Sequence, residues 1–245
     1  MAPAYFMKYI YGPVKSRRLG LSLGLSLTPH KTCNLDCLYC QLGRTKELVS
    51  SRKEYASIKD ILNELRNWIQ ENPDEAKRLK FITISGSGEP TLNIKIGELI
   101  SEIRKISVSS VAVITNATLL GDPKVRQALF GADLLVPSLD AVSPEIFKKI
   151  NRPHEGINLE DIIKGLIALR KEFCGKIWLE VMLVKGVNDG EDEIERLKEI
   201  AEKIKPDKIQ LNSPVRTTAE KGIFPVDKEK LEKIKEILGK KCEII

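Results

Sequence analysis

From residue 57 onward, short apolar segments rich in β-branched residues alternate with longer segments of helical periodicity, and this alternation restricts the fold more than any other feature. Strands are expected at 81–84, 111–115, 134–136, 177–184 and 209–211. A strand expected at 19–27 precedes them and brings the number of strand–helix units to six. Because a helix between consecutive strands permits parallel pairing, the pattern predicts a parallel sheet with helices outside it.

The helices expected between these strands begin at favoured capping residues. Ser57 is a typical N-cap, and Asp60 stands in the capping-box position. Pro123 follows Asp122 in the first turn of another helix, where proline is well tolerated. Further helices are expected over 96–103, from Ser143, from Asn158 to 173, over 190–204 and from Asp227 to about Gly239.

Right-handed connections curl such a sheet into a barrel or partial barrel, and an open doubly wound sheet is the alternative. In both geometries the active site lies at the carboxyl ends of the strands. The length of 245 residues fits one α/β domain, which we expect at 21–245 after an N-terminal extension at 1–20. Functional residues are therefore expected in the loops that follow the strands.

Three of the five cysteines, Cys33, Cys37 and Cys40, stand in the run Cys-Asn-Leu-Asp-Cys-Leu-Tyr-Cys, just after the first expected strand. A cubane iron–sulfur cluster takes one ligand per iron, so three thiolates leave one iron open. An open coordination position distinguishes a reactive metal site from a structural one. The spacing therefore predicts a reactive iron–sulfur centre.

Structural zinc is the alternative reading of these cysteines, with His30 as a fourth ligand. Structural zinc sites usually draw on two separate pairs of closely spaced ligands, and the sequence offers no second pair. Cys174 and Cys242 are isolated and far apart, and we interpret them as packed thiols.

Composition adds only coarse limits. The net charge of +6, from 40 basic and 34 acidic residues, is compatible with an anionic partner but does not require one. The sequence has no apolar stretch of membrane-spanning length, and its N-terminus does not resemble a secretion leader. Few, clustered cysteines indicate a reducing environment, so the expected location is the cytoplasm.

Unusual loops follow several of the expected strands. The run 85–90, Ser-Gly-Ser-Gly-Glu-Pro, follows the second strand, Asn116 the third, and Ser138-Leu139-Asp140 the fourth. Because the carboxyl ends of parallel strands share one edge, these loops are expected to meet the cysteines at the same rim.

With its residues laid out in this way, the chain resembles the radical S-adenosylmethionine (SAM) superfamily. The cysteine motif after the first strand and the Gly-Ser-Gly-Glu-Pro loop after the second carry the resemblance. The runs 12–20 and 31–33 are similar to poorly characterised iron–sulfur oxidoreductases related to the enzymes that build wyosine in tRNA. The resemblance implies a partial (βα)6 barrel of the TIM type.

The resemblance also implies a reaction. Cys33, Cys37 and Cys40 would hold a [4Fe–4S] cluster whose fourth iron is chelated by the amino and carboxylate groups of SAM. One electron from an external donor of the flavodoxin or ferredoxin type would then cleave SAM to methionine and a 5′-deoxyadenosyl radical. That radical would abstract hydrogen from a substrate.

The resemblance assigns SAM contacts to residues of the same rim. They are Tyr39, Gly86, Ser87, Gly88, Glu89, Asn116, Ser138, Asp140, Met182, Val184 and Asn212. Simpler readings exist for several: a tight glycine turn at 86–88, an acid near a helix start at Asp140, and core packing of Met182 and Val184.

Arg152 and His154 interrupt two helices in a loop expected at the active rim. A guanidinium and an imidazole there suit binding of an anionic substrate or transfer of a proton, which makes them candidate catalytic residues. The alternative for His154 is an ordinary surface residue.

The substrate hypotheses rest on the N-terminal segment and on departures from the family. Aromatic residues interleave with cations before residue 19, as in surfaces that stack on bases and bind phosphates, which favours tRNA. The residues are Tyr5, Phe6, Tyr9 and Tyr11 with Lys8, Lys15, Arg17 and Arg18. In the alternative reading, these aromatics close one end of the barrel.

No cysteine precedes Cys33, whereas the wyosine-forming enzymes carry additional upstream cysteines, so wyosine synthesis itself is not expected. Other hypotheses are an activase or an enzyme acting on small molecules or peptides, and, from another class, a non-catalytic iron–sulfur electron carrier. A monomer is expected.

Overall fold

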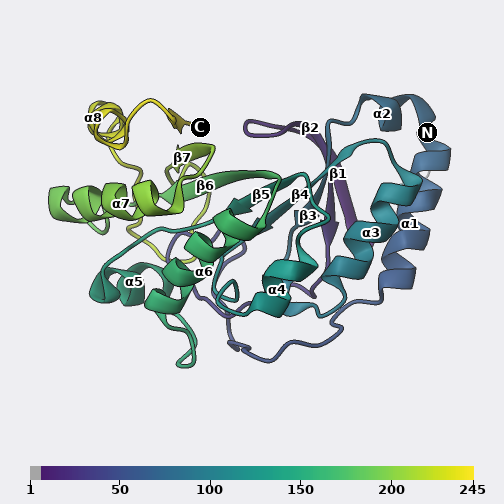
Figure 1. Cartoon of the computed structure of the whole chain (residues 1–245), viewed down its shortest axis with the longest axis horizontal. Coiled ribbons are helices and arrows are strands. Elements are labelled where there is room, and N and C mark those ends of the chain that lie inside the picture. Colours follow the sequence, from purple (N-terminus) through teal and green to yellow (C-terminus); the bar gives the residue numbers. More distant parts are fainter. Residues whose placement is uncertain (1–6) are drawn as a thin grey trace.

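The computed structural model describes residues 7–245, which form a layer of strands with helices packed against its outer face (Figure 1). The strands are β1 (Ile10–Ser16), β2 (Gly20–Ser26), β3 (Phe81–Ser85), β4 (Ser110–Thr115), β5 (Leu134–Pro137), β6 (Lys176–Met182), β7 (Lys208–Asn212) and β8 (Cys242–Ile244). The helices are α1 (Ile58–Glu71), α2 (Pro73–Arg78), α3 (Ile96–Ile106), α4 (Pro123–Ala128), α5 (Pro144–Asn151), α6 (Leu159–Glu172), α7 (Glu191–Ile204) and α8 (Lys228–Leu238), with a 3₁₀ turn at Pro90–Leu92.

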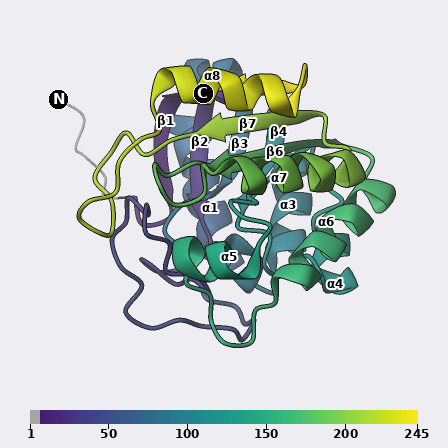
Figure 2. The ribbon, with the colours of Figure 1, turned by 90° about the vertical axis from the view of Figure 1, so that its left-hand side faces the viewer.

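The strands are neighbours in chain order, from β1 to β8. Strands β2 to β8 are parallel, and only β1 runs antiparallel, against β2. The six predicted strand–helix units run from β2 to α8, and the helices surround the curved sheet in the view of Figure 2. The predicted α/β fold with a parallel sheet and outer helices is therefore confirmed.

Helix starts follow the predicted caps, with two exceptions, Ser143 and Asp227, whose side chains make no capping hydrogen bond. The side chain of Ser57 accepts a hydrogen bond from the Asp60 N–H, and the Asn158 side chain caps α6 in the same way. Ser143 precedes α5 but does not cap it, because its hydroxyl bonds to the carboxylate of Glu193 on α7. The Ser143 hydroxyl therefore links α5 to α7 instead of accepting a hydrogen bond from an N–H group at the start of α5.

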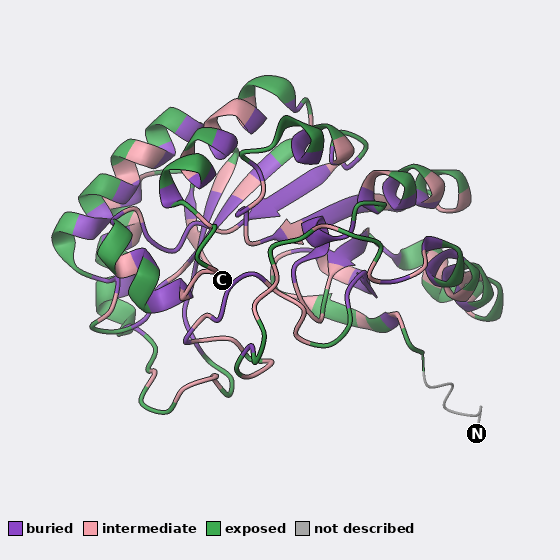
Figure 3. Cartoon of the chain, turned by 90° about the horizontal axis from the view of Figure 1, so that it is seen from below, coloured by how far each residue is buried: buried purple, intermediate pink, exposed green. Residues whose placement is uncertain are grey.

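The two faces of the sheet differ in chemistry. The outer face contributes fully buried residues such as Leu23, Ile84 and Leu179 to the main hydrophobic core beneath the helices. The inner face combines a small apolar cluster around Val136 with buried polar side chains, including Glu180. Figure 3 shows the exposed stripes of the helices facing away from the sheet. No helix within residues 7–245 is long and apolar enough to span a membrane.

The segment expected as an N-terminal extension contributes a strand to the sheet. The N–H groups of Tyr9 and Ile10 donate to the Glu64 carboxylate on α1, at 3.0 and 2.9 Å. At the β1–β2 turn, the Arg18 guanidinium reaches the Glu180 carboxylate on β6 at 2.6 Å. Residues 10–16 are thus part of the sheet.

The aromatic residues proposed for tRNA binding are partly used in the same way. Tyr11 pairs with Gly24 across β1 and β2, and its hydroxyl bonds to Ser85 at the end of β3. Tyr9 packs against the main core. Tyr5 and Phe6 lie outside the described residues. The packing of Tyr9 agrees with the alternative reading, whereas Tyr11 is exposed.

We predict that Gly24→Ala destabilises the protein by about 1–3 kcal/mol, because an added Cβ would lie only 2.0 Å from the Tyr11 ring. The matched control is Gly190→Ala, where an added Cβ meets nothing within 4 Å. Urea denaturation should show a larger decrease in the midpoint for Gly24→Ala than for Gly190→Ala, whose site is the N-cap of α7, where alanine is itself less favourable than glycine. Equal midpoints for the two variants would show that Tyr11 does not hold β1 to β2.

Candidate functional site

The loops predicted to share one rim do meet there. The long loop after β2 carries the cysteines and pairs through Thr32 with Gly88, in the loop after β3. The same loop pairs through Leu35 with Pro153, beyond α5. The cysteine loop is therefore held on two sides by loops from neighbouring strand–helix units.

Each cysteine thiol has a nitrogen donor beside it. The Lys31 ammonium donates to Cys40 Sγ at 2.9 Å. The Asn151 amide nitrogen lies 3.4 Å from Cys37 Sγ, and the Leu35 N–H lies 3.4 Å from Cys33 Sγ. Hydrogen bonds of this kind stabilise negative charge on sulfur, which is the form that ligates iron.

The thiols face different donors and do not share a common centre. Within the part of the chain that the structure describes, no three His, Cys, Asp or Glu side chains are arranged to hold a metal ion. Burial raises the pKa of Cys33 to about 11 and raises that of Cys37 further. Cluster binding therefore requires the side chains to rearrange around a common centre and to release protons. Three thiols from one loop, each near a donor, fit that requirement.

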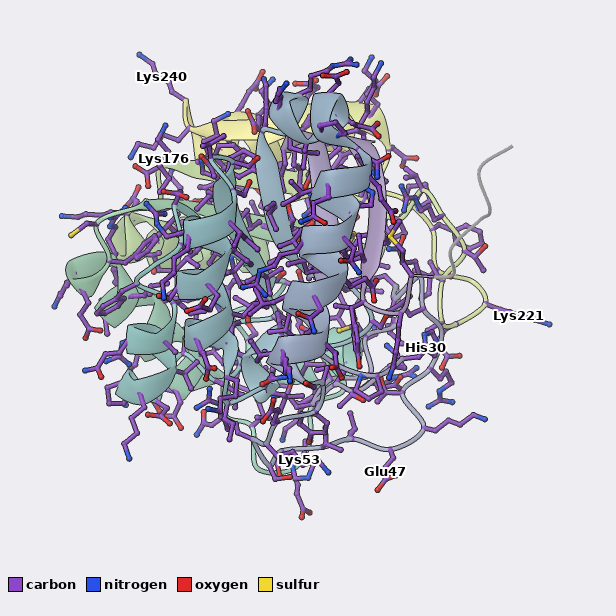
Figure 4. The ribbon with its side chains drawn as sticks, turned by 90° about the vertical axis from the view of Figure 1, so that its right-hand side faces the viewer. His30, Glu47, Lys53, Lys176, Lys221 and Lys240 are labelled. Atoms are coloured by element: carbon purple, nitrogen blue, oxygen red, sulfur yellow. The ribbon has the colours of Figure 1, made fainter. Side chains whose placement is uncertain are left out.

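The structure also places His30, the fourth ligand of the zinc alternative, and the two isolated cysteines. His30 is exposed, and Figure 4 shows its side chain at the molecular surface. Cys242 is buried, as expected of a packed thiol, whereas Cys174 is exposed, so that part of the prediction is wrong. Cys174 follows the end of α6, where the chain turns toward β6, and this position leaves its side chain outside the core.

The glycine loop lies against the cysteine loop so closely that side chains are excluded. A Cβ on Gly88 would lie 1.9 Å from the Thr32 carbonyl oxygen. Gly86 adopts a φ of +107°, a conformation that favours glycine. The carbonyl of Ser87, between them, accepts a hydrogen bond from the Lys31 N–H. The two glycines thus permit direct contact between the backbones of the two loops.

Glu89 holds the glycine loop to the next strand. Its buried carboxylate accepts hydrogen bonds from the Thr91 hydroxyl and the Thr115 hydroxyl, both at 2.6 Å. The Asn116 N–H donates to the other carboxylate oxygen at 2.7 Å. Burial raises the pKa of Glu89 despite these donors. The carboxylate of Glu89 therefore binds its own protein neighbours in this structure.

The Asp140 carboxylate resembles that of Glu89, because it is buried and accepts hydrogen bonds from several segments. The Tyr39 hydroxyl and the Asn151 amide donate to one carboxylate oxygen, the latter at 2.7 Å. The Met182 N–H donates to the other at 2.9 Å. Burial raises the pKa of Asp140 to about 6. Asp140 thereby joins the cysteine loop, the end of α5 and the end of β6.

Four of the polar residues predicted to contact SAM line one small cavity between the cysteine loop and β5. They are Tyr39, Asn116, Ser138 and Asp140. Asn116 also donates to Asn34 at 2.8 Å. The structure thus brings together predicted residues that are widely separated in the sequence.

The remaining predicted SAM contacts lie near the end of β6. Asn212, at the end of β7, donates to Glu180 at 3.1 Å, and Ser138 lies 3.5 Å from the same carboxylate. Met182 is half-buried. Val184 is fully buried in the main hydrophobic core, which agrees with the simpler reading of that residue.

Arg152 and His154 lie on a different side of the cysteine loop. The Arg152 guanidinium contacts Glu220 at 2.7 Å and Asp36 at 3.3 Å. The His154 N–H donates to the Asn34 carbonyl at 2.9 Å, and its ring Nδ1 accepts from Gly156. Neither residue lines the cavity that contains Asp140. In this structure, these contacts hold the loop after α5 to the cysteine loop and to the segment that carries Glu220.

Sequence reasoning missed three residues that organise the site. Lys31, Asn34 and Asn151 each bond to a cysteine thiol or to a predicted contact residue. The closeness of Lys31 and Asn34 to Cys33 in the sequence was an available signal. Nothing in the sequence pattern indicates that Asn151, at the end of α5, meets Cys37.

Comparisons with known proteins agree with this geometry. The family model described as the Radical SAM superfamily matches residues 27–200. A UPF0026 protein from Methanocaldococcus jannaschii is 35% identical over 238 residues, which cover 96% of this chain and 73% of that protein. A protein named GTPase Obg from Brachyspira hyodysenteriae is 40% identical over 97% of this chain, which spans only 34% of that protein.

Solved structures show the same fold. The structure of TYW1 with a lysine-pyruvate adduct bound matches with a TM-score of 0.65 and 22% identity. The match covers 89% of this chain and 72% of that one. At this level of identity, the likeness concerns the fold.

We predict that Asp140 makes the metal-free protein less stable as pH rises from about 4 to above 6. Its pKa of about 6 in the folded state exceeds the ordinary value of 3.8, so the folded state keeps a proton that the unfolded state loses. The loss relative to Asp140→Asn should be on the order of 3 kcal/mol. Urea denaturation across this pH range measures it.

The control for this prediction is Asp74→Asn, because the Asp74 side chain is 95% exposed. Its stability should change with pH as that of the unaltered protein does. A pH profile of Asp140→Asn parallel to that of the unaltered protein would contradict the assigned role of burial.

We further predict that Gly88→Ala impairs cluster loading, because the added Cβ has no space beside Thr32. After anaerobic reconstitution, iron per chain should fall several-fold relative to Gly190→Ala, whose added Cβ meets open space. Normal iron content in Gly88→Ala would show that the contact between the two loops is not needed to present the cysteines.

Proposed function

The chain belongs to the radical SAM superfamily, and from that premise we propose that it cleaves SAM reductively at a [4Fe–4S] cluster held by Cys33, Cys37 and Cys40. The single observation that carries the proposal is the set of three thiols on one rim loop, each beside a nitrogen donor. The enzyme class follows from the family. The cluster ligands and the cleavage are proposed here.

When bound, the cluster and SAM together supply a 5′-deoxyadenosyl radical that takes a hydrogen atom from the substrate. The residues around the thiols have a supporting role. Lys31 and Asn151 donate toward sulfur and so favour the charged ligand state at Cys40 and Cys37. Asn116, 3.6 Å from Cys33 Sγ, extends this set of donors.

For SAM, we assign the amino group to the glycine loop, which offers backbone carbonyls between Gly86 and Gly88 beside the cysteines. Because the Glu89 carboxylate is occupied by Thr91, Thr115 and Asn116, its part is to hold that loop in place. The small cavity has a volume of about 20 Å³, room for about one water molecule, so its lining residues Tyr39 and Asp140 supply polar contacts for the nucleoside part only when the surrounding loops open. Further contacts to SAM are assigned to Ser138, Met182 and Asn212.

A small-molecule or peptide substrate is better supported than tRNA. Tyr9 packs against the main core and Arg18 pairs with Glu180, so of these three only Tyr11, which is 38% exposed, keeps a ring at the surface for stacking on a base. Buried polar residues on the inner face of the sheet, such as Glu180 and Gln210, provide a polar interior instead. tRNA remains the second candidate through the net charge of +6.

We also propose that the protein works as a monomer in the cytoplasm. Three unpaired cysteines that must ligate iron suit a reducing compartment. The one-electron donors proposed for it, of the flavodoxin or ferredoxin type, belong to that setting.

The proposed function predicts formation of 5′-deoxyadenosine after anaerobic reconstitution with iron and sulfide, reduction by dithionite and addition of SAM. Chromatography should show the product with the unaltered protein and none above background with Cys37→Ala. Cys174→Ala is the matched control, because Cys174 is exposed and lies outside the cysteine loop. A reduced cluster that never yields the product with any substrate class would favour the electron-carrier hypothesis.

A further inference from the structure

An open groove lies on the outer side of the cysteine loop, away from the small cavity. Four cationic side chains line it, from Arg44, Lys46, Lys148 and Arg152, together with two carboxylates, from Asp36 and Glu155. Its volume is about 560 Å³. We refer to it as the basic groove. None of the proposed SAM contacts lines it.

The floor of the basic groove is the backbone that carries the cysteines. The Cys33 carbonyl accepts a hydrogen bond from Val49, next to the groove residue Leu48, at 3.0 Å. The Asp36 N–H donates to the Asn151 carbonyl at 3.0 Å on the other wall. Two of the donors to the thiols, Leu35 and Asn151, line the small cavity and not the groove. Asp36, the neighbour of Cys37 in the sequence, lines the groove, so the groove adjoins the cysteine loop.

The charges in the groove are only partly neutralised. Arg44 and Arg152 contact the carboxylates of Asp36 and Glu220. Lys46 and Lys148 take part in none of the ion pairs found among residues 7–245, and both are exposed. Glu155, which is also exposed and in no ion pair among residues 7–245, offsets one of these two ammonium groups. The lining therefore keeps an excess of positive charge, with four cations against two carboxylates. This arrangement attracts an anionic partner.

We propose that the basic groove is the docking surface for an acidic one-electron donor protein of the flavodoxin or ferredoxin type. The inference rests on the proposed function, since only a cluster in this loop needs such a donor. In the step, one electron leaves the reduced donor, which is oxidised, and enters the cluster, which is reduced. No bond forms or breaks, and no group is transferred.

The lining favours a protein over a nucleic acid. Leu48, Pro153 and Ile157 add apolar surface between the cations, as at the centres of protein interfaces. Single-stranded RNA is usually bound by aromatic side chains that stack on bases, and the only ring among the lining residues besides proline is the imidazole of His154. Proximity to the cysteines is required for electron delivery.

The test compares two double variants with equal changes of charge. Lys46→Glu with Lys148→Glu reverses the free charges of the basic groove. Lys176→Glu with Lys240→Glu is the control, because both lysines are exposed and Figure 4 shows them at the opposite end of the molecule from Glu47, the neighbour of Lys46. All four side chains lie outside the proposed catalytic and SAM-binding residues.

The readout is electron transfer itself. Reduced acidic flavodoxin is mixed anaerobically with reconstituted protein in a stopped-flow instrument, and the flavin semiquinone absorbance is followed. At low ionic strength, the second-order rate constant should fall at least about 10-fold for the groove variant and much less for the control. The difference should shrink as salt is added.

Chemical reduction separates this inference from the proposed function. With dithionite, both variants should form reduced cluster and 5′-deoxyadenosine as the unaltered protein does. Equal rate constants for the two variants with flavodoxin would overturn the docking surface. Loss of tRNA binding by the groove variant, with flavodoxin reduction unchanged, would also overturn it. Failure with dithionite in the unaltered protein would overturn the proposed function instead.

Discussion

The site depends on a backbone contact between two loops. The Thr32 carbonyl, one residue before Cys33, accepts the Glu89 N–H at 3.0 Å and lies where any side chain on Gly88 would have to be. Because the cysteine loop follows β2 and the glycine loop follows β3, parallel pairing of these strands delivers both loops to the same edge. The contact then fixes the position of the cysteines relative to the remaining loops. The donors to the thiols and the carboxylate networks are arranged around this junction.

Buried carboxylates complete the arrangement. Glu89 binds donors from the strand β4 side, and Asp140 binds donors from the cysteine loop, α5 and β6. Burying such groups costs free energy unless donors surround them, and here each has at least three. Each carboxylate thus ties together segments that hydrophobic packing alone would leave free to shift. The loops of the rim are thereby joined to one another, each thiol lies beside a donor, and Asp36 of the cysteine loop lines the basic groove.

Periodicity in the sequence predicted the strand–helix units because their apolar faces repeat with clear spacing, as in α3, where Ile96, Leu99, Ile100 and Ile103 are all buried. Strand β1 was not predicted, since its pairing with β2 shifts register between Tyr11 and Val14 and so breaks the alternation. Strand β8 has only three residues, which is too short for a period to appear. The shared rim was predictable from topology. It was not predictable on which side of the cysteine loop Arg152 lies. Arg152 has a left-handed φ of 44°, which turns the chain after α5 in a way that residue type does not indicate.

The central claim is that three protein thiolates leave one iron of the cluster open to SAM. Electron–nuclear double resonance on the reduced, reconstituted protein tests it directly, with SAM that carries ¹⁷O in its carboxylate. The account predicts a hyperfine coupling between the cluster spin and the labelled oxygen, which requires the carboxylate to ligate iron. An intact reduced cluster that shows no such coupling at saturating SAM would contradict the claim, because its iron atoms would then have no place for the cofactor.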